Sequence, residues 1–224
     1  MCILKKLPHQ RQLFLQRWRL TGMKLEEIKK NLTGRTAERI QPPGAKSAAV
    51  LIPLLERDGS VRVLFERRSA DVRQGGEICF PGGMIEPHER PADAAVRETA
   101  EELLLPAEQI EVIAPMHCMP GPGGAEVTSF LGVLHGYGGM FAASEVAEVF
   151  TIPLSWFAEH PPLIHSARMR LETEADFPYH LIPGGRNYPM RSIPRRFYFY
   201  ETEHGVIWGM TAELLYYFLK ENHA

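Results

Sequence analysis

The strongest constraint in this sequence is a set of acidic residues at fixed spacing. Glu98, Glu101 and Glu102 lie three and four positions apart. A helix with about 3.6 residues per turn therefore places their three carboxylates on one face. Like charges on one helix face repel each other by about 0.2–0.5 kcal/mol per pair. A helix that crowds them without intervening lysines is expected to bind a cation, and carboxylate oxygens suit hard divalent ions such as Mg²⁺ or Mn²⁺.

The acidic helix belongs to a longer pattern, Gly-x5-Glu-x7-Arg-Glu-x2-Glu-Glu, which follows a glycine-rich turn. Its positions are Gly83, Glu89, Arg97, Glu98, Glu101 and Glu102. The pattern resembles the Nudix box, the motif of hydrolases that cut a nucleoside diphosphate linked to another moiety. The resemblance implies a Nudix-type α/β/α sandwich with a mixed β-sheet. A solvated acidic surface helix is the alternative, but six specified positions make it the weaker interpretation.

Two positions depart from the family pattern, and neither supplies chemistry. Thr99 stands where an aliphatic residue is usual, and Leu104 stands where glycine is usual. The loss of the glycine leaves open how the helix ends and how the next loop leaves it. Pro106 can still stop the helix, because proline disfavours helical geometry at Leu105.

Each acidic or basic position of the pattern has an expected role. Arg97 is interpreted as structural, because its fixed charge can hold neighbouring carboxylates in place. Glu89 is interpreted as its partner in that network, which orients the metal ligands. The predicted metal ligands are the carboxylates of Glu98, Glu101 and Glu102 and the main-chain oxygen of Gly83, which no side chain shields.

The resemblance implies that a general base comes from a later loop, outside the acidic helix. Glu145 is the favoured candidate, Glu148 is the next, and Glu126 is a third option. A positioned base contributes about 10²–10⁴-fold in rate. The alternative, that these are ordinary loop carboxylates, stays open, because spacing alone does not place them within hydrogen-bond reach of a substrate.

The segment before the acidic helix narrows the substrate class. Residues 64–83 resemble the motif of coenzyme A pyrophosphatases within the Nudix group, with one residue missing between Arg73 and Gly76. The resemblance implies hydrolysis of coenzyme A or its thioesters to 3′,5′-ADP and 4′-phosphopantetheine or its acyl form. Arginine forks bind phosphate bidentately, although pairing of these arginines with nearby carboxylates is the alternative. The predicted substrate contacts are Arg68, Ser69 and Arg73.

Two other functions remain compatible with the same sequence. One is a Nudix hydrolase of another nucleoside diphosphate derivative, such as ADP-ribose or a dinucleotide. The other is a nucleotide-sensing module without catalysis, against which the complete acidic set argues.

Composition bounds the remaining possibilities. A net charge of −2 gives no basic field for nucleic acid. The longest apolar stretch is far shorter than the roughly 18 residues of a membrane span. Three scattered cysteines fit a reduced, cytoplasmic location, and a homodimer is left open.

The expected organisation is an N-terminal extension, 1–22, a helix and linker, 23–44, and the Nudix domain, 45–223.

Hydrophobic periodicity predicts the elements of that domain. A long loop at 177–189 has two interpretations: Tyr179, Arg186 and Tyr188 contact an adenine or a phosphate, or Phe177 and Tyr179 cover the core, which is favoured. Trp208 is predicted to be a core residue. Strands are expected at 47–56, 61–65, 77–80, 110–116, 127–134, 149–154, 163–171, 195–201 and 206–208, and helices from 91, at 155–158 and at 211–220.

Overall fold

The structure, a computed structural model, describes residues 24–36, 46–121 and 124–221. The chain divides into two units, residues 1–41 and 42–224. In the first unit, helix α2 (Leu25–Leu32) confirms the helix expected within 23–44, and none of its residues is buried. The extension predicted at 1–22 and the linker residues 37–44 lie outside the described residues.

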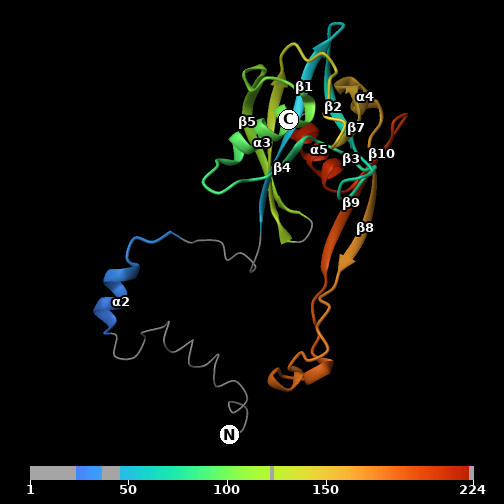
Figure 1. Cartoon of the computed structure of the whole chain (residues 1–224). Coiled ribbons are helices and arrows are strands. Elements are labelled where there is room, and N and C mark those ends of the chain that lie inside the picture. Colours follow the sequence, from blue (N-terminus) through green and yellow to red (C-terminus); the bar gives the residue numbers. More distant parts are fainter. Residues whose placement is uncertain (1–23, 37–45, 122–123, 222–224) are drawn as a thin grey trace. The chain divides into compact units, whose positions relative to one another are not determined.

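The second unit is built on a seven-stranded mixed sheet (Figure 1). Its strand order is β3-β2-β1-β6-β5, with β4 paired to β1 and β7 paired to β2. The neighbours β1 and β6 run parallel, whereas the other pairings are antiparallel. The strands are β1 (Ser47–Arg57), β2 (Ser60–Arg68), β3 (Ile78–Cys79), β4 (Gly82–Met84), β5 (Ile110–Pro120), β6 (Glu126–Leu134) and β7 (Val146–Pro153).

Strand β1 is buried on both faces, so its residues alternate between two cores. Ile52 faces a core that α4 (Leu154–Glu159) and α5 (Gly209–Glu221) close with residues such as Phe157 and Leu214. Leu51 faces the opposite core, which α3 (Pro91–Leu103) closes. The helices therefore cover both faces of the sheet, which confirms the predicted α/β/α sandwich.

Helix α3 shows how the missing glycine is accommodated. The helix begins at Pro91, whose fixed φ suits the first turn, and it ends at Leu103. Leu104 then adopts the left-handed conformation, with φ 47° and ψ 43°, and its amide donates to the Ala100 carbonyl. A leucine thus performs the chain reversal for which glycine is usual.

A second, three-stranded antiparallel sheet is formed by β8 (Leu163–Met169), β9 (Ile193–Thr202) and β10 (Gly205–Ile207). β8 and β9 run as a ribbon away from the rest of the unit, toward the segment that connects them (Figure 1). We call residues 163–196 the arm. Every residue of β8 is exposed.

Two packing predictions were wrong. Trp208 is 43% exposed rather than a core residue. Phe177 and Tyr179 pack edge-to-face on each other, with ring centroids 4.9 Å apart, within the connection between β8 and β9 rather than over the core.

Among the helices formed by the described residues, none combines the length and apolarity that a membrane span requires.

Candidate active site

Arg97 of α3 anchors the loop before the helix through hydrogen bonds to Glu89. Its Nε and Nη2 donate to Glu89 Oε1 and Oε2 at 2.9 and 3.0 Å, a bidentate pair. Glu89 Oε2 also accepts from the Glu86 amide at 2.8 Å. These bonds lower the pKa of Glu89 and raise that of Arg97. Arg97 Nη1 also donates to Glu98 Oε1 at 2.8 Å, so one guanidinium orients two carboxylates.

Strand β4 places the main chain of two glycines, Gly82 and Gly83, against the acidic face of α3. The Gly82 amide donates to Glu102 Oε2 at 2.8 Å. A Cβ on Gly83 would lie 2.4 Å from Glu98 Cδ, and a Cβ on Gly82 would lie 2.3 Å from the Ala49 carbonyl oxygen. Gly82 also has a φ of 147°, in the region that favours glycine. Gly83 is therefore required for the approach of Glu98, and Gly82 for the close packing of β4 on β1.

Glu102 is almost completely buried, with 3% of its surface exposed. Burial raises its pKa to about 9, and the nearby charges of Glu66 and Glu98 add to the rise. Arg68 and the bond from Gly82 oppose it. A carboxylate kept in such surroundings is poised to bind a cation or to retain a proton.

The second buried carboxylate, Glu66 of β2, is a residue that the motif analysis did not assign. It is 1% exposed. Its Oε1 accepts from Cys79 Sγ at 3.2 Å, whereas its Oε2 has no hydrogen-bond partner among the described residues. Burial raises its pKa to about 7. Strand alternation could have revealed it, because Glu66 lies two positions after the core residue Leu64 and so shares its face.

The predicted metal ligands differ in their surroundings. Glu98 and Glu102 both contact β4, whereas the Glu101 side chain is 61% exposed and lies 3.5 Å from Arg97 Nη1. No three acidic, histidine or cysteine side chains of the described residues are gathered closely enough to hold a metal ion. The donor set nevertheless fits a dication chemically: the charges of Glu66 and Glu98 add to the raised pKa of Glu102, and the buried Glu66 Oε2 has no hydrogen-bond partner among the described residues. A dication would relieve that repulsion.

The three candidate bases are placed in different environments. A relay of main-chain bonds holds Glu145 beside the site: Ala142 donates to the Glu102 carbonyl, Glu145 to Ala142, and Ser69 to Glu145, at 2.8, 3.0 and 2.8 Å. The charge of Glu145 also contributes to the raised pKa of Glu66. Ser69, which was predicted as a substrate contact, is buried, and its amide anchors the loop that carries Glu145.

The other two candidates lie apart from this relay. Glu148 of β7 pairs with Arg67, whose Nε donates to Glu148 Oε2 at 3.1 Å. Arg67 follows Glu66 directly, so the two side chains point to opposite faces of the sheet. Glu126 Oε1 accepts from Cys118 Sγ at 3.0 Å at the start of β6. The structure brings only Glu145 together with the buried carboxylates.

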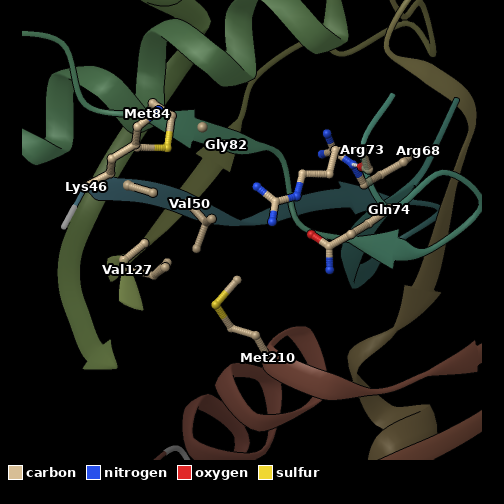
Figure 2. A pocket seen from close by; sticks show the side chains of 12 residues that line it. Lys46, Val50, Arg68, Arg73, Gln74, Gly82, Met84, Val127 and Met210 are labelled. Carbon is tan, nitrogen blue, oxygen red and sulfur yellow. Dashed lines mark hydrogen bonds between the residues drawn. The ribbon is translucent and has the colours of Figure 1, made fainter. Parts of the chain in front are cut away.

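A cavity of about 550 Å³ lies against the two glycines of β4. Figure 2 shows Arg68, Arg73 and Gln74 on one side of it, Lys46 and Met84 on the other, and Met210 reaching from α5 toward Val50. Of the described residues that line it, three are cationic and none is acidic. Sequence reasoning missed Lys46, Met84 and Met210, which reach the cavity only through the tertiary fold.

Two smaller cavities share lining residues with it. One, of about 270 Å³, shares Arg68, Gln74 and Met210 with it and is also lined by Trp208. The other, of about 470 Å³, shares Lys46 and Met84 and extends to Pro87. We call these three adjoining cavities the groove.

Arg68 links the groove to the buried carboxylates. Its Nε donates to the Arg73 carbonyl at 3.0 Å, which shapes the loop between β2 and β3. Burial lowers the pKa of Arg68, but its interactions with Cys79, Glu102 and Glu66 raise it overall. A positive charge is thereby kept at the boundary between the acidic cluster and the groove.

Comparison with known proteins identifies the family of this chain. The NUDIX domain family model matches residues 45–168. An uncharacterized Nudix hydrolase, NudL, of Photorhabdus laumondii is 30% identical over 76% of this chain and 82% of its own length. The peroxisomal coenzyme A diphosphatase NUDT7 of Mus musculus is 36% identical over 59% of this chain and 56% of its own. The crystal structure of RenU, a Nudix hydrolase from M. smegmatis, covers 52% of this chain and 77% of its own, with 29% identity and a TM-score of 0.43. This chain belongs to the Nudix family and is a pyrophosphohydrolase of the kind that requires divalent metal ions.

Proposed function

We propose that this protein hydrolyses the diphosphate linkage of coenzyme A or its thioesters, with Mg²⁺ or Mn²⁺, to 3′,5′-ADP and 4′-phosphopantetheine or its acyl form. The observation that carries the proposal is the cationic cavity against β4, whose two glycines contact the acidic helix on their other side. The mouse relative, named as a coenzyme A diphosphatase, supports the same substrate class.

The form of the groove suits this substrate. Coenzyme A is elongated, with an anionic middle and less charged ends. The cations Lys46, Arg68 and Arg73 line the middle of the groove, and Trp208 lies at one end. Arginine binds phosphate bidentately, and an exposed tryptophan offers a flat surface for a ring to stack on. The groove thus offers positive charge where this substrate carries negative charge.

The proposed chemistry is attack of water on phosphorus. Glu98, Glu101, Glu102 and the main-chain oxygen of Gly83 would hold a dication, which neutralises the diphosphate and lowers the pKa of bound water. Arg68 and Arg73 bind the phosphates and orient the linkage. Glu145 takes the proton from the attacking water, and Arg97 holds Glu98 and Glu89 in position. The main-chain relay from Glu102 keeps Glu145 next to this centre.

The wider organisation is also part of the proposal. Residues 45–223 form the catalytic domain, preceded by the 23–44 helix and linker and by a 1–22 extension. The cytoplasmic location stays a prediction from the three scattered cysteines. Glu148 is not used in this mechanism, because it pairs with Arg67 on the opposite face.

A panel of diphosphate substrates tests the proposal. The full-length protein is assayed with coenzyme A, acetyl-coenzyme A, ADP-ribose and a diadenosine polyphosphate, in Mg²⁺ and in Mn²⁺, and the products are identified by mass spectrometry. We expect kcat/KM for coenzyme A or its thioester to exceed the others by at least about tenfold. A preference for ADP-ribose or the dinucleotide would reject the proposed substrate. Glu101→Gln, expected to be inactive but folded, controls for contaminating hydrolases.

A further inference from the structure

The arm exposes a surface that the proposed reaction does not use. Its large apolar side chains Leu163, Ile164, Met169, Leu171, Leu181 and Ile193 are 49–62% exposed. β8 pairs on one side with β9, and among the described residues no strand pairs with its other edge. A two-stranded ribbon with both faces in water is marginally stable by itself, and an open strand edge is a template for pairing.

The segment Arg168–Glu174 continues this open edge and carries unused charge. Between Arg170 and Asp176 no backbone amide donates a hydrogen bond to another described residue. Neither Arg168 nor Arg170 forms an ion pair with any described carboxylate, and neither do Glu172 and Glu174 with any described cation. Within the segment, Arg168 bonds Ser192, Thr173 bonds Tyr179 and the Glu174 carbonyl accepts from Phe177. The amides from Arg170 to Glu174 and the charges of the two arginines and two glutamates are therefore available to a partner.

The sequence of this segment is complementary to itself. It reads Arg-Met-Arg-Leu-Glu-Thr-Glu. Laid antiparallel to a second copy about Leu171, it places Arg168 opposite Glu174 and Arg170 opposite Glu172. The charged residues share one face, and Met169, Leu171 and Thr173 share the other. Opposite charges facing each other across two strands are stabilising, whereas like charges there are destabilising.

We propose that the arm is a dimerisation element in which residues 168–174 pair antiparallel with the same residues of a second copy of this chain. The charge pattern selects a second copy as the occupant, because a two-fold axis through Leu171 matches each arginine with a glutamate. Such an isologous contact closes on itself and is the commonest arrangement of oligomers. It covers the end of the open edge of β8, at Arg168 and Met169, and the exposed side chains of Met169 and Leu171.

A charge-swap experiment on the full-length protein tests this. Arg168→Glu with Arg170→Glu makes the segment wholly acidic, and Glu172→Arg with Glu174→Arg makes it wholly basic. Sedimentation velocity at micromolar concentration should show dimers for the wild type and at least about tenfold weaker dimerisation for each variant alone. An equimolar mixture of the two variants should restore the dimer, because each arginine again faces a glutamate.

Two controls keep the outcome specific. Arg186→Glu with Arg191→Glu changes the net charge by the same amount as the acidic variant, but at positions outside the segment. This control variant should leave the dimer intact. Circular dichroism shows that each variant is folded, and heterodimer formation in the mixture shows it independently. A monomeric wild type, or a mixture that stays monomeric, overturns the proposal.

Discussion

The backbone of Gly83 and the carboxylate of Glu98 occupy adjoining space, so that a Cβ on Gly83 would lie 2.4 Å from Glu98 Cδ. The obstructing atom is the far end of a flexible side chain. Gly83→Ala should therefore displace Glu98 while leaving the fold intact. Because a 1 Å misplacement costs about 10²-fold in rate, we expect kcat/KM to fall at least about a hundredfold with little change in melting temperature.

Gly82→Ala is the matched comparison for that variant. Its Cβ would meet the Ala49 carbonyl oxygen at 2.3 Å, and the φ of 147° strains any other residue. Backbone cannot yield as a side chain can, so we expect a loss of about 3 kcal/mol or more in unfolding free energy. If thermal melts show equal stability for the two variants, this assignment of the obstructing atoms is incorrect.

The two candidate bases can be separated by parallel substitutions. Glu145→Gln should lower kcat by about 10²–10⁴-fold, because the relay from Glu102 places this residue beside the acidic cluster. Glu148→Gln should leave kcat within a small factor of the wild type, because this residue pairs with Arg67. Steady-state rates at saturating coenzyme A and metal decide between them, and a larger loss for Glu148→Gln would reverse the assignment.

Arg73 provides a test of the groove that is separate from catalysis. Its guanidinium lines the cationic cavity, whose walls are shown in Figure 2. A hydrogen bond to a charged group contributes about 1.5–3 kcal/mol, so Arg73→Ala should raise KM about ten- to a hundredfold with a smaller change in kcat. Arg57→Ala, at the exposed end of β1, is the control. Equal kinetics for the two variants would place the substrate elsewhere.

The burial of Glu66 predicts that the stability difference between Glu66→Gln and the wild type depends on pH. Its pKa is raised from 4.5 to about 7 by burial, so the folded state holds the proton more tightly than the unfolded state. Its contribution to stability is therefore full below pH 4.5 and is lost as the pH rises toward 7. Glu66→Gln removes that loss, and should be stabilised relative to the wild type by about 1–3 kcal/mol more at pH 8 than at pH 5.

Denaturation in metal-free buffer at both pH values measures this difference. The exposed Glu108 provides the control, since Glu108→Gln should show no such difference. A gain for Glu66→Gln that is the same at both pH values would contradict the assignment of a burial penalty on the charged form.

A substitution of Leu104 should increase the stability of the fold, because Leu104 adopts a left-handed conformation that costs non-glycine residues about 1–2 kcal/mol. Glycine relieves that strain but loses more chain entropy on folding, so Leu104→Gly should gain about 0.5–1 kcal/mol. Leu104→Val should instead lose stability, because a β-branched residue tolerates positive φ poorly. Chemical denaturation measures both, and a stabilised valine variant would contradict the strain argument.

Features encoded by neighbouring residues could be predicted from the sequence. The spacing of Glu98, Glu101 and Glu102 predicted helix α3, and Pro91 marked its start, because both are local properties. The boundaries were less accurate where pairing partners decide them. β5 was expected at 110–116 but continues to Pro120, because its ladder with β6 continues to Glu126.

Features that depend on distant segments could not be predicted. Glu145 and Glu148 lie three positions apart, yet only the pairing of β7 with β2 shows that Glu148 meets Arg67. Trp208 has apolar neighbours in sequence but is partly exposed, because it borders the groove rather than the core. Lys46 gave no local signal, since its position beside the arginines arises only when β1 and β4 pair.

The pairing of β4 with β1 leaves only a peptide layer between the cationic and acidic halves of the site. At Gly82 and Gly83 there is nothing but main chain to screen one from the other, and Arg68 already influences the pKa of Glu102 through it. The two halves consequently form a single electrostatic unit. Charge substitutions in the groove and on the helix are thus expected to be non-additive, although the sequence separates them by some thirty residues.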